Sequence, residues 1–249
     1  MNKHVMIDLE TMSTAPNAAI VQIGVEFFDP LGPILYTSPS GRCWNVDLRS
    51  CQKAGLHIDG DTVVWWLQQP KEAQDALLSP DPLPVSLALH ELATLSDGHG
   101  FVVQWDEYCV WSHGATFDCV ILDQAYRAVG KRTPWHFRNV RDTRTLFDLV
   151  DPNQEIALED VGPRHHALWD AWRQAVKMQK CYRLFNMWRT QSIEHDLHEI
   201  KMGVPESPIC YCGLPTPGTP QDYDSFCKVC GGSLYSRFGG SHADNSFNP

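Results

Sequence analysis

The sequence predicts an α/β domain built on a mixed sheet, and three observations support this class. The first apolar stretches have the length and alternation of strands, and strands and amphipathic helices alternate after them. Such an order of elements indicates a mixed sheet covered by helices. The chain has 249 residues, 43% of them hydrophobic and 20% charged. This is enough for one large domain with an appendage, and it excludes wholesale disorder.

Four segments are expected to contribute to the sheet. His4–Leu9 and Ala18–Phe28 are the first two strand candidates, and a polar break at 11–17 separates them. Residues 43–48 alternate well enough to continue the sheet, and Tyr108–Trp111 is a further short apolar strand. Apolar runs of this length bounded by turn residues are typical of strands.

Helical periodicity fills most of the chain between and after these strands. Asp61 is a candidate N-cap for the first helix, which would carry Val64, Trp65 and Leu67. Further helices are expected at 71–78, 85–95, 117–129 and 167–188, whereas 140–149 is mixed. The last of these helices is long and amphipathic, so we expect it to pack one face on the sheet.

The formal net charge of −10 would normally exclude a nucleic acid as a partner. Its distribution weakens that exclusion, because residues 127–144 and 164–189 each hold six Lys or Arg residues against a single acid. Two interpretations stay open. The stretches are ordinary solvated helix faces, or they form a local surface that attracts phosphate, since fields act locally under physiological screening.

The chain shows no sign of membrane insertion or export. No apolar run approaches the roughly 20 residues of a membrane span, and the first ten residues lack the apolar core of a signal peptide. A cytoplasmic protein with reduced thiols is therefore expected. Five of the nine cysteines are scattered and are interpreted as reduced core residues. They are Cys43, Cys51, Cys109, Cys119 and Cys181.

Asp8 and Glu10 end the first predicted strand. Side chains two residues apart on a strand point to the same face, so these two carboxylates lie side by side. Like charges placed so closely favour a divalent cation that prefers oxygen ligands, such as Mg²⁺ or Mn²⁺. A solvated strand end is the alternative for this pair taken alone.

Three more residues extend the set. Asp118 follows a strand and a glycine turn and opens a helix, where the helix dipole also favours a plain acid. Asp170 lies near the start of the long helix, and His165 precedes that helix by one loop step. Four carboxylates and a histidine fit phosphoryl chemistry with two metal ions, in which the histidine takes a proton from water as general base.

The spacing of these residues resembles a known superfamily. Asp8-x-Glu10, Asp118 after Gly-x-x-Phe, and His165-x-Ala-Leu-x-Asp170 look like the three motifs of the DEDDh 3′–5′ exonucleases. That superfamily includes ribonuclease T, oligoribonuclease and the proofreading subunit of DNA polymerase. Flanking stretches resemble its exonuclease VIII-like, phage exonuclease A-like and mycobacterial exoribonuclease-like branch. They are residues 7–12, 17–21, 62–67 and 141–146.

The resemblance covers roughly residues 3–190 and carries several expectations. It implies a ribonuclease H-like fold, with a five-stranded mixed sheet flanked by helices. It implies that the four carboxylates hold two Mg²⁺ or Mn²⁺ ions, that His165 is the base, and that single-stranded RNA or DNA is the substrate. A homodimer is one arrangement that it allows, and a phage origin would place the protein in the host cytoplasm. A non-catalytic nucleic-acid-binding or adaptor module on the same fold is the alternative function.

Substrate contacts are expected at five positions. Relatives place backbone amides and an apolar wedge after the first motif, where this chain has Leu9, Thr11 and Met12. Trp65 and Trp66 could stack a base, although at least one of them is expected in the core; Trp66 is taken as the contact. Arg141 is a candidate phosphate contact.

The tail carries a second motif. Cys210-x-Cys212 and Cys227-x-x-Cys230, each followed by glycine, match a tetrahedral site for one structural Zn²⁺, with two disulfides or free thiols as alternatives. The tail also has few large apolar residues, and such a short segment could scarcely fold without the metal. The expected organisation is an exonuclease domain followed by a linker, a zinc-ribbon-like segment and a flexible tail. Their ranges are 1–200, 201–209, 210–235 and 236–249.

Overall fold

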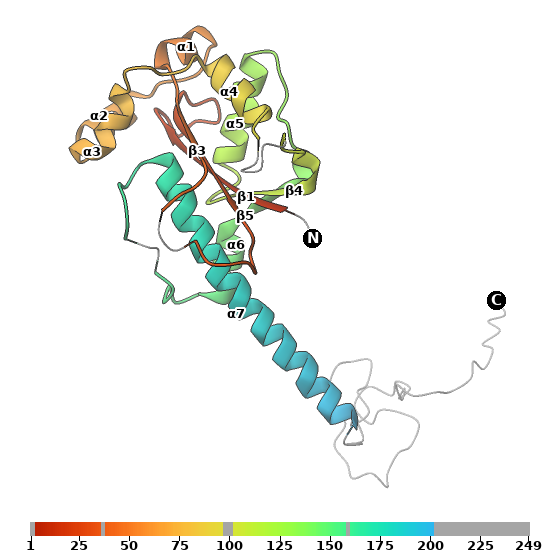
Figure 1. Cartoon of the computed structure of the whole chain (residues 1–249). Coiled ribbons are helices and arrows are strands. Elements are labelled where there is room, and N and C mark those ends of the chain that lie inside the picture. Colours follow the sequence, from red (N-terminus) through yellow and green to blue (C-terminus); the bar gives the residue numbers. More distant parts are fainter. Residues whose placement is uncertain (1–2, 36–37, 97–101, 158–159, 202–249) are drawn as a thin grey trace, which may run out of the picture. The chain divides into compact units, whose positions relative to one another are not determined.

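The computed structural model describes residues 3–35, 38–96, 102–157 and 160–201. The chain divides into two units, Met1–Arg189 and Thr190–Pro249, and every strand of the described residues lies in the first (Figure 1). None of the described helices combines the length and the apolar character needed to cross a membrane.

The first unit is built on a five-stranded sheet with strand order β3-β2-β1-β4-β5. β1 pairs antiparallel with β2 and parallel with β4, whereas β2–β3 is antiparallel and β4–β5 is parallel. This confirms the prediction of a mixed five-stranded α/β sheet. The strands are β1 Lys3–Thr11, β2 Ile20–Phe28, β3 Arg42–Asn45, β4 Tyr108–Ser112 and β5 Val140–Asp142.

Seven α-helices and three short 3₁₀ helices accompany the sheet in the described residues. The α-helices are α1 Leu48–Lys53, α2 Gly60–Leu67, α3 Lys71–Gln74, α4 Val85–Ala93, α5 Asp118–Ala128, α6 Thr143–Val150 and α7 Ala167–Lys201. The 3₁₀ helices are Asp75–Leu78, Trp105–Glu107 and Phe137–Asn139.

Three expectations about these elements need correction. The third strand ends at Asn45 and α1 follows, because the Asp47 side chain accepts a hydrogen bond from the Arg49 amide and starts a helix there. The cap of α2 is Asp59, whose carboxylate accepts from the Thr62 amide, and Asp61 lies inside the first turn. α7 also extends beyond residue 188, to Lys201.

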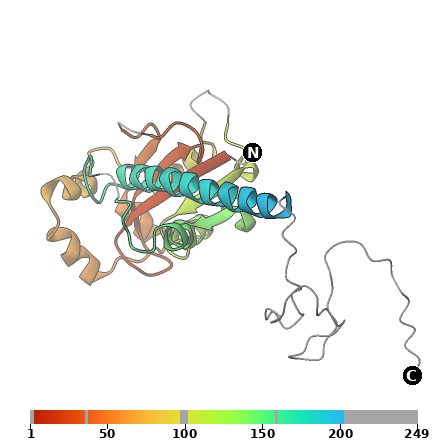
Figure 2. The same ribbon diagram turned by 90° about the horizontal axis from the view of Figure 1, so that it is seen from below.

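Two apolar clusters cover the two faces of the sheet. Alternate residues of β1 point to opposite faces, so Val5, Ile7 and Leu9 join one cluster whereas Met6 joins the other. The first cluster includes α4 and α5, and the second includes α6 and the first half of α7. Figure 2 shows α7 crossing its face of the sheet. Asp8 and Glu10 follow Met6 on the face that α7 covers.

The described cysteines agree with reduced core residues. Cys51, Cys109, Cys119 and Cys181 are buried free thiols, and Cys43 is a half-buried one. Burial raises the pKa of Cys51 to about 11, which keeps that thiol protonated and unreactive.

Candidate active site

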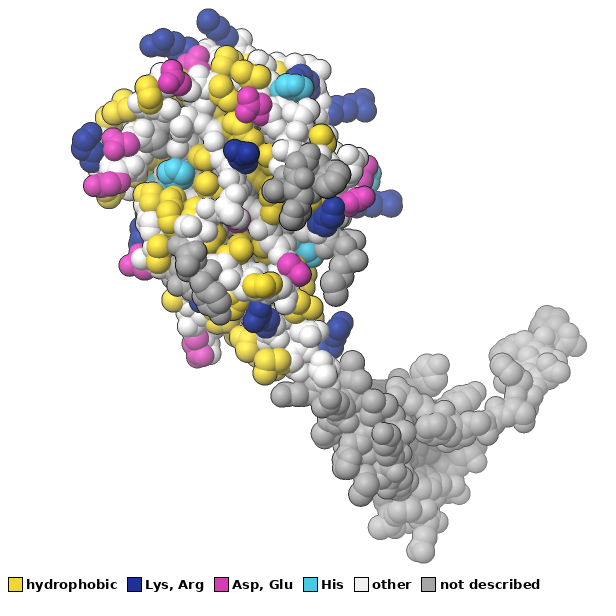
Figure 3. Space-filling view, viewed as in Figure 1, with side chains coloured by type: hydrophobic (Ala, Val, Ile, Leu, Met, Phe, Trp, Pro, Cys, Tyr) yellow, Lys and Arg dark blue, Asp and Glu magenta, His cyan; other side chains and the backbone are white. Residues whose placement is uncertain are grey.

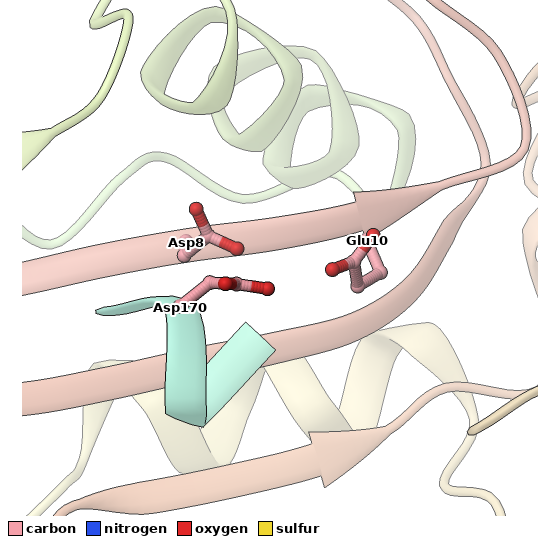
Figure 4. Close-up of side chains that lie close together, drawn as sticks. All are labelled: Asp8, Glu10 and Asp170. Carbon is pink, nitrogen blue, oxygen red and sulfur yellow. The ribbon is translucent and has the colours of Figure 1, made fainter. Parts of the chain in front are cut away.

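Three carboxylates meet on the face of the sheet that α7 covers. Asp8 and Glu10 come from the end of β1 and Asp170 from the first turn of α7, and one oxygen of each lies within 4.8 Å of the others (Figure 4). Glu10 is buried, whereas Asp8 and Asp170 are half-buried. Carboxylate oxygens at such separations suit a divalent cation.

Glycine in β2 allows α7 to come this close. Gly24 is paired with Asp8, and a Cβ placed on it would lie 2.1 Å from the backbone carbon of Ala167 and 2.3 Å from the Leu168 nitrogen. The start of α7 therefore rests directly on the backbone of β2. The Ala167 amide also donates to the Gln22 side chain, at 3.2 Å. Both contacts bring Asp170 beside Asp8.

Asp118 is the fourth acid. It opens α5, is 3% exposed, and accepts a hydrogen bond of 3.1 Å from the Leu9 amide. It lies outside the group of three but close enough to act electrostatically on both Asp8 and Glu10. The sequence predicted that these four carboxylates belong to one site, and the structure places Asp118 within electrostatic reach of Asp8 and Glu10.

The cluster is unfavourable when all its members are charged. Burial, followed by the charges of Asp118, Glu10 and Asp170, raises the pKa of Asp8 well above its usual range. Burial, followed by Asp170 and Asp118, raises the pKa of Glu10 from 4.5 to about 8. Burial also raises the pKa of Asp118 to about 7, although the Leu9 amide opposes this rise. Buried acids that repel one another need positive charge beside them, so the donor set fits divalent cations.

Two side chains of α7 hold the carboxylates in place, and neither role was predicted from the sequence. Gln174 donates through Nε2 to Asp8 Oδ1 at 2.7 Å, and its buried Oε1 has no partner among the described atoms. Arg173 donates to Asp170 Oδ1 at 2.5 Å. The helical spacing i, i+3 between Asp170 and Arg173 was the available signal.

His165 lies in the loop before α7 with a left-handed backbone, φ 56°. Its ring contacts α2 edge to face, with its centroid 5.0 Å from that of Trp65 and 6.3 Å from that of Trp66. Its neighbour His166 differs, because the His166 amide donates to Asp170 Oδ2 at 3.1 Å while its buried Nδ1 has no partner among the described atoms. Trp66 in turn donates to the Thr11 carbonyl at 2.9 Å, which connects this aromatic group to the end of β1.

The structure corrects the choice of Trp66 as the substrate contact. Trp66 is 1% exposed in the first core cluster, so it offers no ring face to a base, whereas Trp65 is 41% exposed. The other predicted contacts differ in burial. Leu9, Thr11 and Met12 are buried, and Arg141 is exposed on β5.

The basic stretches are partly used inside the protein. Arg173 pairs with Asp170, and Lys177 pairs with Asp151 at 2.8 Å; both cations are buried. On the face drawn in Figure 3, Lys and Arg side chains are scattered and do not gather into one patch. Arg144 is an exposed cation close to the acids. Its guanidinium carbon lies 3.1 Å from where a Cβ of Gly114 would stand, and it acts electrostatically on Asp118.

The predicted zinc ligands lie outside the described residues. They are Cys210, Cys212, Cys227 and Cys230.

The comparisons with known proteins find exonucleases. The model of the 3′–5′ exoribonuclease Rv2179c-like domain matches residues 3–182. An exodeoxyribonuclease of Enterobacteria phage T4 is 28% identical over 165 residues, which cover 58% of this chain and 70% of the relative.

Similar solved structures include nucleases as well. One is E. coli exonuclease I bound to single-stranded DNA, with a TM-score of 0.47 and 16% identity over 80% of this chain and 45% of that longer one. Another is the nuclease domain of 3′hExo, a DEDDh family member bound to rAMP, with a TM-score of 0.45 and 13% identity over 73% of this chain and 92% of that one. Because both scores are below 0.5, the assignment depends on the sequence match over residues 3–182, by which this chain belongs to the family of 3′–5′ exoribonuclease Rv2179c-like domains.

Proposed function

We propose that this protein is a metal-dependent 3′–5′ exonuclease with a ribonuclease H-like fold. It hydrolyses single-stranded nucleic acid or 3′ overhangs and releases nucleoside monophosphates. The observation that carries the proposal is the group of Asp8, Glu10 and Asp170, whose oxygens lie within 4.8 Å of one another in a chain of this family.

Asp8, Glu10, Asp118 and Asp170 would hold two Mg²⁺ or Mn²⁺ ions. The raised pKa values of Asp8, Glu10 and Asp118 support this assignment. Burial raises all three, the neighbouring acids add to the rise for Asp8 and Glu10, and a bound cation would stabilise the charged carboxylates. Two such ions, when bound, stabilise the charge on the attacking and leaving oxygens of the phosphodiester. The protein's part is to fix the acids, which the Gln174 and Arg173 contacts do.

His165 is the proposed general base. Its role is to accept a proton at a ring nitrogen from the attacking water, and its place in the loop directly before α7 supports that role. The edge-to-face contact with Trp65 orients the ring. A positioned base typically contributes about 10²–10⁴-fold to the rate.

Substrate would be held by Trp65 and by exposed arginines. The exposed ring of Trp65 lies against His165, where a terminal base stacked on it would gain about 1–3 kcal/mol. Arg144 is an exposed cation near Asp118 and suits a backbone phosphate. Arg141 stays a candidate for the same role, and Leu9, Thr11 and Met12 stay candidates for contact with the terminal nucleotide. The Leu9 amide already donates to Asp118 and the Met12 amide to the Ala19 carbonyl.

The remaining parts of the proposal concern assembly and place. A Zn²⁺ ion held by the four tail cysteines would organise the segment after the exonuclease domain. The proposed assembly is a homodimer. The proposed place of action is the cytoplasm, which is the host cytoplasm if a phage encodes the protein.

One digestion experiment tests the function. Matched single-stranded RNA and DNA of the same sequence are labelled at the 3′ end and incubated with Mg²⁺ or Mn²⁺, beside strands whose last 3′ linkages are phosphorothioates. We expect labelled mononucleotide from unblocked strands and none after chelation, with recovery when Mg²⁺ returns. Asp8→Asn should release none. Binding of both strands without release would instead identify an adaptor, and the ratio of the two rates assigns RNA or DNA.

A further inference from the structure

Arg173 makes contacts beyond the ion pair with Asp170 described above. It lies one helical turn after Asp170 in α7, and its side chain is only 6% exposed. Its guanidinium donates to three acceptors: Asp170 Oδ1 at 2.5 Å, the Gly162 carbonyl at 3.0 Å and the Pro163 carbonyl at 2.6 Å. The planar guanidinium group of arginine can donate hydrogen bonds to several acceptors at once, and lysine could not reproduce this arrangement.

These contacts fix the backbone on both sides of His165. Arg173 holds the carbonyl of Pro163 before it, and Asp170 accepts from the amide of His166 after it. Asp170 and Arg173 are themselves paired, so one ion pair anchors both ends of the segment. The His165 side chain, which is expected to accept a proton, therefore lies between two backbone groups that the Arg173–Asp170 pair holds.

The loop needs such support. His165 has φ 56°, a left-handed conformation that residues other than glycine adopt only at a cost and that persists where the surroundings impose it. Gly162, with φ 78°, packs against Trp169 so closely that a Cβ would lie 2.3 Å from the indole ring. The loop is therefore pressed onto α7 in one conformation.

Another arginine, which lies in the loop before α7, serves as a comparison with Arg173. Arg164 pairs with Asp160 at 3.1 Å, but the two side chains are 76% and 86% exposed. Exposed ion pairs of this kind contribute little to the stability of the loop conformation. Removal of a buried arginine that donates to three acceptors would instead leave all three acceptors without that partner. The contrast singles out Arg173 as the residue that holds the loop.

We propose that Arg173 is a positioning residue that sets the backbone of His165 and the orientation of the Asp170 carboxylate together. The cation site and the base are thereby assembled as one unit, and neither can move without the other. The proposal rests on the proposed function, since that function assigns the cation site and the base their roles. The conformation of the loop can nevertheless be measured without catalysis.

The test compares three variants of the full chain with wild type. Arg173→Met removes the charge and all three contacts, Arg173→Lys keeps the charge, and Arg164→Gln is the control on the same loop. Amide hydrogen exchange is measured without added divalent cation, and kcat and KM are measured with Mg²⁺ on a single strand.

We expect Arg173→Met to speed exchange of the amides at 164–166 at least tenfold while the amides of β1 keep their wild-type rates. Its kcat should fall at least tenfold with KM unchanged within twofold, because Arg173 is buried and holds the site without touching substrate. Arg173→Lys should recover part of both losses, and Arg164→Gln should stay within twofold of wild type.

Unchanged exchange at 164–166 in Arg173→Met would overturn the proposal, as would a rise in KM at constant kcat. Arg173→Met could exchange rapidly throughout β1 and so fail to fold, and Arg173→Lys then decides. Faster exchange confined to 164–166 together with a lower kcat supports the proposal, and wild-type values for either overturn it. A wild-type protein that releases no mononucleotide would refute the proposed function, while the exchange data would still test the positioning of the loop.

Discussion

Replacing Glu10 by glutamine should stabilise the cation-free protein, and the gain should grow with pH. The substitution keeps the size of the side chain and removes one charge from a buried site. In the folded protein, burial and the neighbouring acids raise the pKa of Glu10 from 4.5 to about 8. Between these two values the folded state binds more protons than the unfolded state, so the stability of wild type falls as pH rises through this window.

The size of the effect follows from the two pKa values, 4.5 and about 8. One pKa unit corresponds to about 1.4 kcal/mol, which gives a loss for wild type of about 3 kcal/mol at pH 7 and about 5 kcal/mol well above pH 8. Glu10→Gln lacks this loss. For a domain of this size, 3 kcal/mol corresponds to a rise in Tm of about 6–12 °C.

The assay is urea and thermal unfolding of wild type and Glu10→Gln at pH 5, 6, 7 and 8 with no added divalent cation. Glu72→Gln, an exposed change in α3, is the control and should stay within about 0.5 kcal/mol of wild type. Adding Mn²⁺ should stabilise wild type more than Glu10→Gln, which has lost a ligand. A difference between Glu10→Gln and wild type that stays constant from pH 5 to pH 8 would refute the reasoning.

Five further substitutions test other parts of the structure. His165→Ala should lower turnover about 10²–10⁴-fold with substrate affinity retained, whereas His166→Ala should be much milder; equilibrium binding and single-turnover rates separate the two, and the reverse order would shift the third motif by one residue. Gly24→Ala should destabilise the protein by about 1–3 kcal/mol or more in chemical unfolding, because its Cβ would lie 2.1 Å from the backbone of α7; a wild-type midpoint would contradict the close approach. Trp65→Ala should raise KM several-fold with little change in stability, since the ring is 41% exposed, and unchanged KM would exclude base stacking there. Cys227→Ser should lose about one tightly held zinc per chain in metal analysis of freshly purified protein, and wild type without zinc would end that assignment.

The elements of the fold were largely predictable because their signals are local. Apolar alternation in His4–Leu9 and Ala18–Phe28 anticipated β1 and β2, and the sheet continued at β4 as expected. The errors occurred where two local signals compete. Asp59 and Asp61 can each cap α2, and only the hydrogen bond to the Thr62 amide distinguishes them.

The site was predictable in part for the same reason. The period of a strand places Asp8 and Glu10 on one face whatever the rest of the chain does. The choice between Trp65 and Trp66 was not available from the sequence, because adjacent helical residues differ in burial only once the helix has docked. In the structure Trp66 faces the core and Trp65 faces solvent.

The sequence by itself therefore determined which acids are candidates for the site, the period that pairs Asp8 with Glu10, and the family. Only the tertiary structure decided how Asp170 reaches them and what holds it. Gly24 lets α7 rest on β2, and Arg173 joins Asp170 to the loop that carries His165. Gly24 and Ala167 meet only when the helix packs onto the sheet, and the Pro163 contact depends on how the loop folds against α7. The i, i+3 spacing indicates the pairing of Asp170 with Arg173. Periodicity and spacing record only what neighbouring residues in the chain do, so no local pattern could have specified the other two contacts.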